Sequence, residues 1–301
     1  MCSVTPDPKT YFPKIEGNLT RVVWAHAVNS QELLNSTLKR EDVMMLEGDV
    51  VLGRLNTSAE NAYMIPIMAH PPNNQSDLSL EEFLKTVSTN KGTMGVKLDF
   101  KSLEAFTASQ TILKKAHDDF EYPIFLNADI LPGPVNATTL PVDAKAFVSQ
   151  AKSFENCTLS IGWTTRYGKE DNIKDGAYTI EQIDSMIKTL KEHNVTQSVT
   201  YAVRAGLAAN SATVIKSLIE QSSKMKNPTL TIWSSEGDEV NAEKLSQLIK
   251  DVDVQNVYID VPESLMKKLQ LSGASSLSVT TMIIGASLFV SMFLSSVTRR
   301  V

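Results

Sequence analysis

The segments MMLEGDVVL (residues 44–52) and GVKLDFK (residues 95–101) decide the fold and point to a functional site. Each is an apolar run interrupted by charged residues at every second position: Glu47 and Asp49 in the first, and Lys97, Asp99 and Lys101 in the second. Side chains two residues apart on a β-strand project from the same face, so each segment predicts a strand with one charged face. Such charge is costly unless it is paired or binds a ligand.

Apolar runs with strand character recur along the chain and alternate with helical patterns. The eight predicted strands are Val22–His26, Met44–Val50, Gly95–Phe100, Ile124–Asn127, Leu159–Gly162, Ser198–Val203, Leu230–Trp233 and Val257–Val261. Helix starts are predicted at Ser79, Thr179 and Asn241, each a residue type that caps helices. Eight βα units in about 250 residues are typical of a TIM (β/α)8 barrel. The run Tyr63–Ala69 then predicts a hairpin after the second strand.

Composition sets the domain organisation. The chain has 301 residues, of which 42% are hydrophobic and 21% charged, and this is typical of one large folded domain. We expect an N-terminal segment over 1–19, the α/β barrel over 20–268 and a C-terminal hydrophobic helix within 269–301. The net charge of −5 and the lack of a basic cluster argue against nucleic acid as a partner.

Polar residues fall at the ends of the predicted strands, which in a TIM barrel meet at the mouth where active sites lie. Glu47, Asp49 and Asp99 offer the hard oxygen ligands that Mg²⁺ or Ca²⁺ prefers, so we expect them to hold a divalent cation. His26 and His70 flank these acids and suit acid and base roles in phosphodiester cleavage. The predicted substrate-binding residues are Asn29, Lys97, Lys101, Asn127, Asp129, Trp163, Arg204 and Trp233.

Each of these residues also has a structural interpretation. Glu47 and Asp49 fit a buried ionic network with Lys97 and Lys101 that needs no metal. A lone strand histidine fits a hydrogen-bonded core position, and the two tryptophans fit core packing. Arg204 fits either an anionic ligand or a salt bridge to a barrel carboxylate.

The order of the site residues resembles the glycerophosphodiester phosphodiesterase and phospholipase C type of barrel. In those enzymes a His ends the first strand, Glu-x-Asp ends the second, another His follows on a short excursion, and Glu-x-Lys ends the third. The matching positions here are His26, Glu47-Gly48-Asp49, His70 and Asp99-Phe100-Lys101. Two features depart from the pattern: the usual His-Arg-Gly is His26-Ala27-Val28, without an arginine to clamp phosphate, and the third acid is Asp.

A second resemblance covers about Thr20–Met266 and is carried by WAHAVNS (24–30), GVKLDFK (95–101), LNADILPGP (126–134) and SIGWTTRYG (160–168). These strings resemble the menorin family, animal proteins built on this barrel and typically secreted or membrane-attached. The resemblance implies cell-surface signalling with adhesion receptors, as in dendrite and neurite patterning, and leaves catalysis open. We therefore carry two hypotheses: a metal-dependent hydrolase of a phosphodiester small molecule or lipid, and a non-catalytic extracellular signalling or adhesion cofactor.

The C-terminal segment bears on location. No charged residue occurs from Leu269 to Thr298, and the run SLSVTTMIIGASLFVSMFLSSV (276–297) is long enough to cross a bilayer. We predict a single-pass membrane helix; a lipid-anchor signal with small residues from Gly273, or a buried helix, are the alternatives.

Asn-X-Ser/Thr sequons favour an extracellular barrel, either membrane-attached or secreted. They begin at Asn18, Asn35, Asn56, Asn74, Asn136, Asn156 and Asn194. The start MCSVTPDPKTYF lacks the apolar region of a signal peptide, which fits secretion only if the tail itself inserts or the true start lies upstream.

Overall fold

The computed structural model describes residues 6–59, 61–90, 94–117, 121–169, 171–223 and 225–271. The predicted C-terminal membrane helix over 276–297 and the small residues from Gly273 lie outside these ranges. Within the described part, no helix combines the length and hydropathy that crossing a bilayer requires.

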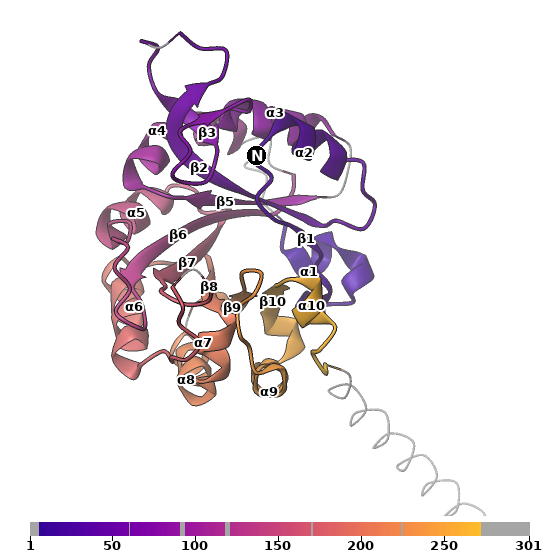
Figure 1. Ribbon diagram of the computed structural model, residues 1–301, viewed down its shortest axis with the longest axis vertical. Helices are drawn as coiled ribbons and strands as arrows, with labels where there is room; N and C mark the ends of the chain where they lie inside the picture. The colour runs from indigo at the N-terminus through magenta and orange to yellow at the C-terminus, as the bar shows by residue number, and fades with distance from the viewer. Residues whose placement is uncertain are drawn as a thin grey trace, which may run out of the picture.

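Eight parallel strands of the described chain form a nearly closed barrel in the order β1-β2-β5-β6-β7-β8-β9-β10, with β3 and β4 paired to β2 (Figure 1). The strand bounds are β1 Trp24–Ala25, β2 Met45–Leu55, β3 Ile65–Met68, β4 Gln75–Ser76, β5 Gly95–Phe100, β6 Ile124–Pro132, β7 Thr158–Thr164, β8 Ser198–Arg204, β9 Lys226–Trp233 and β10 Val257–Asp260. The predicted α/β barrel of the TIM type is confirmed at this level.

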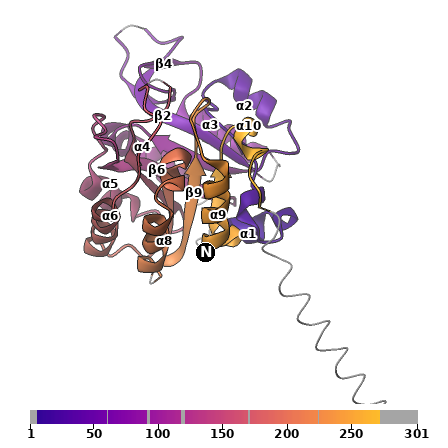
Figure 2. The ribbon, with the colours of Figure 1, turned by 60° about the horizontal axis from the view of Figure 1, so that its bottom comes forward.

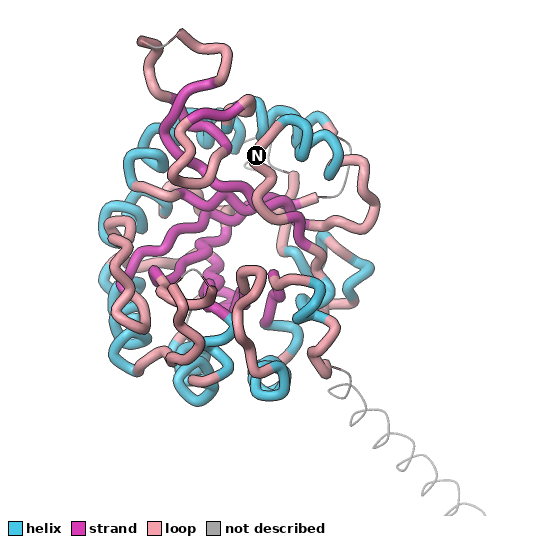
Figure 3. Tube along the Cα trace, in the orientation of Figure 1, coloured by secondary structure: helices cyan, strands magenta, loops and turns pink. Residues whose placement is uncertain are grey.

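Helices cover the outside of the barrel, as the tube in Figure 3 and the turned view in Figure 2 show. Their bounds are α1 Pro8–Tyr11, α2 Gln31–Thr37, α3 Leu80–Thr89, α4 Leu103–His117, α5 Ala144–Ala151, α6 Ile180–Glu192, α7 Ala205–Ala209, α8 Ala212–Gln221, α9 Ala242–Val252 and α10 Glu263–Met266. Ser79, Thr179 and Asn241 cap α3, α6 and α9 as predicted, and the capping box at Thr179 is complete. On α6, Ile183, Met186, Ile187 and Leu190 are buried against the sheet.

The first and last strands of the barrel are bridged by side chains. Trp24 on β1 packs edge-on against Tyr258 on β10 with 6.0 Å between ring centroids, and Phe125 on β6 contacts both rings. Phe12 and Ile15, from the N-terminal turns that precede the barrel, join this cluster. The apolar cluster therefore fills the end of the barrel where the strands begin, and leaves the opposite end to polar side chains.

The excursion predicted over Tyr63–Ala69 is present. Strand β3 runs antiparallel to the outer half of β2, from Val50 opposite Met68 to Gly53 opposite Ile65, and the hairpin projects from the barrel in Figure 1. This pairing, followed by that of Arg54 and Leu55 with β4, explains why β2 extends to Leu55, beyond the predicted end at Val50.

Strand β1 is shorter than predicted. Val22 closes a 3-10 turn over Leu19–Arg21, and Ala27 has a positive φ of 52°, so only Trp24–Ala25 stays extended. The backbone therefore turns directly after His26, which sets the position of that side chain at the mouth.

Candidate functional site

A cavity of about 560 Å³ opens at the carboxyl ends of the barrel strands. Its lining includes eleven of the thirteen predicted site residues. The lining residues are His26, Glu47, Asp49, His70, Pro71, Lys97, Asp99, Phe100, Lys101, Asn127, Asp129, Thr139, Leu140, Val142, Thr164, Thr165, Tyr167, Asp171, Ala202, Arg204, Trp233 and Ser235. The C-terminal end of a parallel barrel is where such sites are expected.

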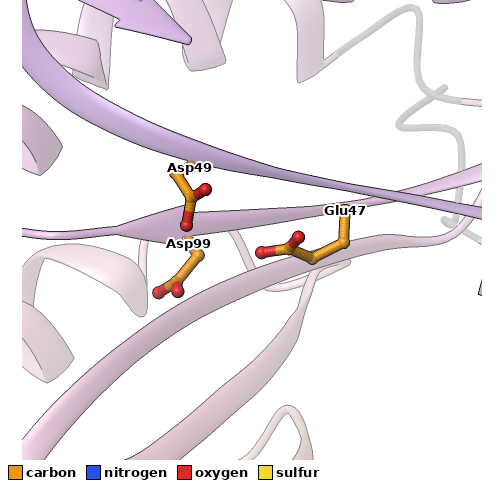
Figure 4. Close-up of side chains that lie close together, drawn as sticks. All are labelled: Glu47, Asp49 and Asp99. Carbon is orange, nitrogen blue, oxygen red and sulfur yellow. The ribbon is translucent and has the colours of Figure 1, made fainter. Parts of the chain in front are cut away.

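Three carboxylates converge on the wall made by β2 and β5. Glu47, Asp49 and Asp99 each offer one oxygen within 4.8 Å of the others, and Figure 4 shows them gathered between the two strands. The strand register pairs Asp49 with Asp99, which places both on the same face. Three carboxylates of this kind are a suitable ligand set for Mg²⁺ or Ca²⁺.

Fixed hydrogen bonds orient these acids. Asn29 donates from Nδ2 to Asp49 at 2.7 Å and accepts the Asp49 backbone N–H at 2.9 Å. The Ala27 N–H donates to Glu47 at 2.8 Å, because the positive φ of Ala27 turns it inward. Burial raises the pKa of Glu47, and the nearby His26 and Lys97 only partly oppose this effect.

Lys101 lies between two of the acids. Its Nζ is 2.9 Å from Asp49 and 2.5 Å from Asp99. Burial opposes the charge on Lys101, but Asp99 and Asp49 still raise its pKa above the ordinary value. The pair of Lys101 with Asp49 fits the ionic network that the sequence left open as an alternative to a metal, whereas Asp99 was not part of that network.

Lys97 differs from Lys101. Its residue is 5% exposed and lines the cavity, and its Nζ lies 5.8 Å from the centroid of the Trp24 ring. No described residue forms a hydrogen bond or an ion pair with it. The predicted pairing of Lys97 with Glu47 or Asp49 is therefore absent from the described part of the chain.

His26 stands at the edge of the acidic cluster. Its Nδ1 is 3.3 Å from Asp260 and 3.4 Å from Glu47, while the side chain is 62% exposed. The hydrogen bond to Asp260 raises the pKa of His26 to about 9, with Glu47 adding to this effect and burial opposing it. His26 is thus a half-open residue of the mouth, which rules out the interpretation as a core histidine.

His70 lies on the other rim of the cavity, just after β3, and is exposed. Its Nδ1 donates to the Pro71 carbonyl oxygen at 2.7 Å, so the neutral ring keeps Nε2 as its free acceptor. The structure thus brings both predicted histidines to the same cavity as the three acids.

Asn127 and Asp129 end the accessible part of β6. Asn127 accepts from Ser160 at 2.6 Å and donates to Asp99 at 2.7 Å, so it supports the acidic cluster and helps Lys101 hold the pKa of Asp99 below its ordinary value against burial. Asp129 is different: burial, then the charge of Asp99, raises its pKa to about 7.

Arg204 forms a closed arrangement on the opposite wall. Its guanidinium donates twice to Asp238, at 2.8 and 2.9 Å, and once to Thr165 at 3.1 Å. The same group lies 5.0 Å from the Trp233 ring centroid and 5.5 Å from that of Tyr167. Its partner is thus a loop residue after β9 instead of the barrel-strand carboxylate that the sequence suggested.

Two predicted contacts do not line the cavity among the described residues. Trp163 is 1% exposed and packs on Tyr178, with 5.4 Å between ring centroids. Asn29 reaches the site only through Asp49. Their positions fit core packing and support of the acid, respectively. Trp233 does line the cavity, beside Arg204.

Sequence reasoning missed Asp260, Asp238 and Thr164. Asp260 ends the last apolar strand, so the signal that identified Asp49 and Asp99 was present there too. Asp238 sits in a polar loop whose fold the sequence does not specify, and nothing in the pattern marks it as the partner of Arg204.

Comparison with known proteins identifies the class first. The model of the Menorin N-terminal domain matches residues 18–266, which is most of the chain. The human protein FAM151B is 35% identical over 243 residues, covering 80% of this chain and 83% of the relative. The chain therefore belongs to the menorin family, as the sequence strings predicted.

Solved structures give only a distant likeness. A candidate α-L-fucosidase from Bacteroides thetaiotaomicron is 11% identical with a TM-score of 0.44, and covers 81% of this chain and 86% of its own. The GH53 catalytic domain from Ignisphaera aggregans is 12% identical with a TM-score of 0.42, and covers 81% and 84%. Likeness at this level says nothing about the chemistry of the site.

Proposed function

We propose that this menorin-family barrel binds a divalent cation, Mg²⁺ or Ca²⁺, through Glu47, Asp49 and Asp99 and hydrolyses a phosphodiester at the same cavity. The observation that carries this proposal is the convergence of three carboxylate oxygens within 4.8 Å of one another, two of them from buried residues, in a cavity that two histidines also line. The order of these residues along the chain resembles the glycerophosphodiester phosphodiesterase pattern, and supports the same reaction class.

The cation would neutralise charge on the phosphate and make phosphorus more open to attack. The cationic side chains placed to contact phosphate oxygens are Lys101, which lies between Asp49 and Asp99, and Lys97, which has no ion pair within the described part of the chain. Lys97 on β5 and Lys101 directly after it would thus replace the arginine that is missing after His26.

His26 and His70 exchange protons with the nucleophile and the leaving group. Asp260 orients the His26 ring through Nδ1, which leaves Nε2 for the reaction, and the Pro71 carbonyl does the same for His70. Where the substrate carries a neighbouring hydroxyl, that group attacks first, the bond to the leaving oxygen breaks, and a cyclic phosphate forms.

The test uses the full chain, a chromogenic phosphodiester such as bis(p-nitrophenyl) phosphate, and millimolar Mg²⁺ or Ca²⁺. We expect His26→Ala to lower turnover by about 10²-fold or more, because a general acid or base contributes that much. His193→Ala is the matched control, since His193 lies outside the cavity and donates to the Thr189 carbonyl. Equal turnover in wild type and His26→Ala would remove the catalytic proposal.

A second candidate function is a non-catalytic extracellular module that engages adhesion receptors. It is favoured by the exposed apolar residues on the projecting β2–β3 hairpin: Tyr63 is 95%, Met64 54% and Ile65 37% exposed. It predicts that Tyr63→Ser weakens binding to a receptor ectodomain while Asp49→Asn does not. The reverse pattern would count against this candidate.

The sequons support an extracellular barrel, and the uncharged run 276–297 supports attachment to a membrane by a single helix or a lipid anchor. A secreted form fits the same sequons. A mobility shift on glycosidase treatment of protein from animal cells tests this location, and unchanged mobility would contradict it.

A further inference from the structure

The loop that follows β6, residues 133–142, is closed at its base on the rim of the cavity. The Val142 N–H donates to the Asp129 carbonyl oxygen at 2.8 Å, so the loop returns to the strand that it leaves. Gly133 packs directly against the carbonyl group of Thr164 at the end of β7, where a Cβ would not fit. The base of the loop is therefore fixed to two strands of the barrel.

The tip of this loop connects a packed segment to an open one. Val135 packs against Gly176 in the loop after β7, again without space for a Cβ. Thr139 and Leu140 line the cavity, and Leu140 is 89% exposed. Residues 136–138 lie between these two segments, so they are held at the rim beside the entrance of the cavity.

The tip contains one of the Asn-X-Ser/Thr sequons, Asn136-Ala137-Thr138. Asn136 and Thr138 are both exposed, and no described residue forms a hydrogen bond with the Asn136 side chain. The backbone of Asn136 has a φ of 49°, in the left-handed region that asparagine adopts more readily than most residues. The amide nitrogen of Asn136 is therefore open to solvent, as a glycan attached to a folded protein requires.

The other sequons differ from this one in burial or in position. Four of them contain an Asn or a hydroxyl residue that is buried or half-buried, namely Asn18 with Thr20, Thr37, Ser76 and Asn156. Asn56 and Asn194 are exposed, but Asn56 lies on the projecting hairpin and Asn194 precedes β8 at the opposite end of the barrel. Among the sequons with both residues exposed, Asn136 is thus the one beside the cavity.

We propose that Asn136 carries an N-linked glycan that covers the β6 side of the mouth and keeps large ligands out of the cavity. The proposal rests on the extracellular location in the proposed function and not on its chemistry. In the transfer, Nδ2 of Asn136 attacks the anomeric carbon of a lipid-linked oligosaccharide. A C–N bond forms, the bond from this carbon to the lipid diphosphate breaks, and the amide nitrogen loses one proton.

The cavity lies within reach of such a glycan. Asn136 and Thr139 are three residues apart in the sequence, at most about 11 Å, because each residue spans about 3.5 Å. The core of an N-linked glycan is at least as long, bulky and well hydrated. Because Gly133 and Val142 fix the base of the loop, the loop keeps the glycan at the rim. A small molecule passes beside the glycan, whereas a protein or a bilayer surface is held away from the cavity.

Occupancy of the site is measured on the full chain produced in animal cells. Peptide-N-glycosidase in heavy-oxygen water converts each glycosylated Asn to a labelled Asp, which peptide mass spectrometry locates. We expect the label at Asn136 in wild type and in Thr139→Ala, which keeps the sequon, and no label there in Thr138→Ala. Labels at other sequons with none at Asn136 would overturn this proposal alone. No label at any sequon would overturn it together with the extracellular location.

Access to the cavity is measured with a thiol at its rim. Thr139→Cys, in a Cys2→Ser background, places a thiol in the lining, and Cys157 is only 1% exposed. N-ethylmaleimide should label this thiol equally with and without Thr138→Ala. A maleimide on a long polyethylene glycol chain should react about tenfold more slowly when the glycan is present, which corresponds to about 1.4 kcal/mol in the reaction barrier.

Ser223→Cys is the matched control for access, because Ser223 is exposed after α8 at the opposite end of the barrel. Its labelling by the large reagent should not depend on Thr138→Ala. Equal rates of the large reagent at Thr139→Cys with and without the glycan would contradict the proposal. An equal slowing of the small reagent would contradict it too, because the loop itself would then have changed.

The glycan and the proposed chemistry fail separately. Thr138→Ala removes the glycan and is expected to keep cation binding and turnover of the small bis(p-nitrophenyl) phosphate. Asp49→Asn removes a proposed cation ligand and is expected to keep the glycan at Asn136. A glycan at Asn136 without cation binding would leave this proposal and remove the hydrolase, whereas cation binding without the glycan would do the reverse.

Discussion

The two walls of the cavity handle charge in different ways. On the β8 and β9 wall, Arg204 is matched by one acid, Asp238, in a two-pronged pair whose side chains are 9% and 1% exposed. On the β2 and β5 wall, Asp49 and Asp99 share Lys101 and Glu47 lies beside them, while Lys97 has no hydrogen-bond or ion-pair partner among the described residues. The first wall is closed and structural, while the second carries charges that a ligand would complete.

The largest expected effect is the loss of the closed pair. Arg204→Met leaves Asp238 buried without a cation and is expected to destabilise the fold by about 3–5 kcal/mol in denaturant unfolding. Arg21→Met is the control, because its pair with Glu16 is exposed and such pairs are worth about 0–1 kcal/mol. Similar losses in the two variants would contradict the account of this wall as a buried, one-to-one pair.

The open wall should behave differently because a cation can replace its lysine. Lys101→Met leaves Asp49 and Asp99 close together and is expected to cost on the order of 2 kcal/mol of stability. Ca²⁺ or Mg²⁺ added at 100 times its Kd should raise the free energy of unfolding of this variant by about 2.7 kcal/mol, which offsets the loss. Arg204→Met should gain much less from the same ions. No rescue of Lys101→Met would mean that these acids do not form a cation site.

A smaller effect depends on pH. The pKa of Asp129 is about 7 in the folded protein, against an ordinary value of 3.8. Between about pH 4 and pH 7 the carboxyl group is therefore protonated in the folded state and ionised in the unfolded state. Wild-type stability should therefore fall as pH rises from about 4 to about 7. Asp129→Asn should match wild type near pH 4 and be more stable at pH 8, on the order of 2 kcal/mol after allowing for partial exposure.

Asp42→Asn is the comparison, because the pKa of Asp42 is shifted in the opposite direction to that of Asp129. Asp42 is exposed, and the hydrogen bond from Arg40 lowers its pKa. The folded protein therefore favours the ionised form of Asp42, and Asp42→Asn should not increase stability at pH 8. Urea midpoints at pH 4, 6 and 8 measure both variants, and a pH-independent difference for Asp129→Asn would contradict the assigned pKa.

Much of the barrel could be predicted from the sequence because buried parallel strands leave apolar runs. The strand predicted over Gly95–Phe100 is β5 residue for residue, and the charged faces of β2 and β5 meet as the period of two requires. The site residues on strands followed from this. The length of β2 could not be predicted, because its outer half is set by pairing with β3 and β4, which depends on tertiary structure.

Partners contributed by loops could not be predicted. Asp238 reaches Arg204 from a loop after β9, and Ala27 turns its N–H to Glu47 through a positive φ that alanine rarely adopts. Neither leaves a periodic signal. Asp260 is the exception, since a charged residue at the end of an apolar strand was visible in the sequence and needed only the same argument as Asp99.

The central claim, that the β2 and β5 wall holds a divalent cation, is tested most directly by calorimetric titration of Mg²⁺ and Ca²⁺ into the full chain. The variants are Asp49→Asn and, as control, the exposed Asp42→Asn. The account predicts saturable binding to wild type and to Asp42→Asn, and loss of binding in Asp49→Asn. Absence of binding to wild type, or equal binding to all three proteins, would contradict it.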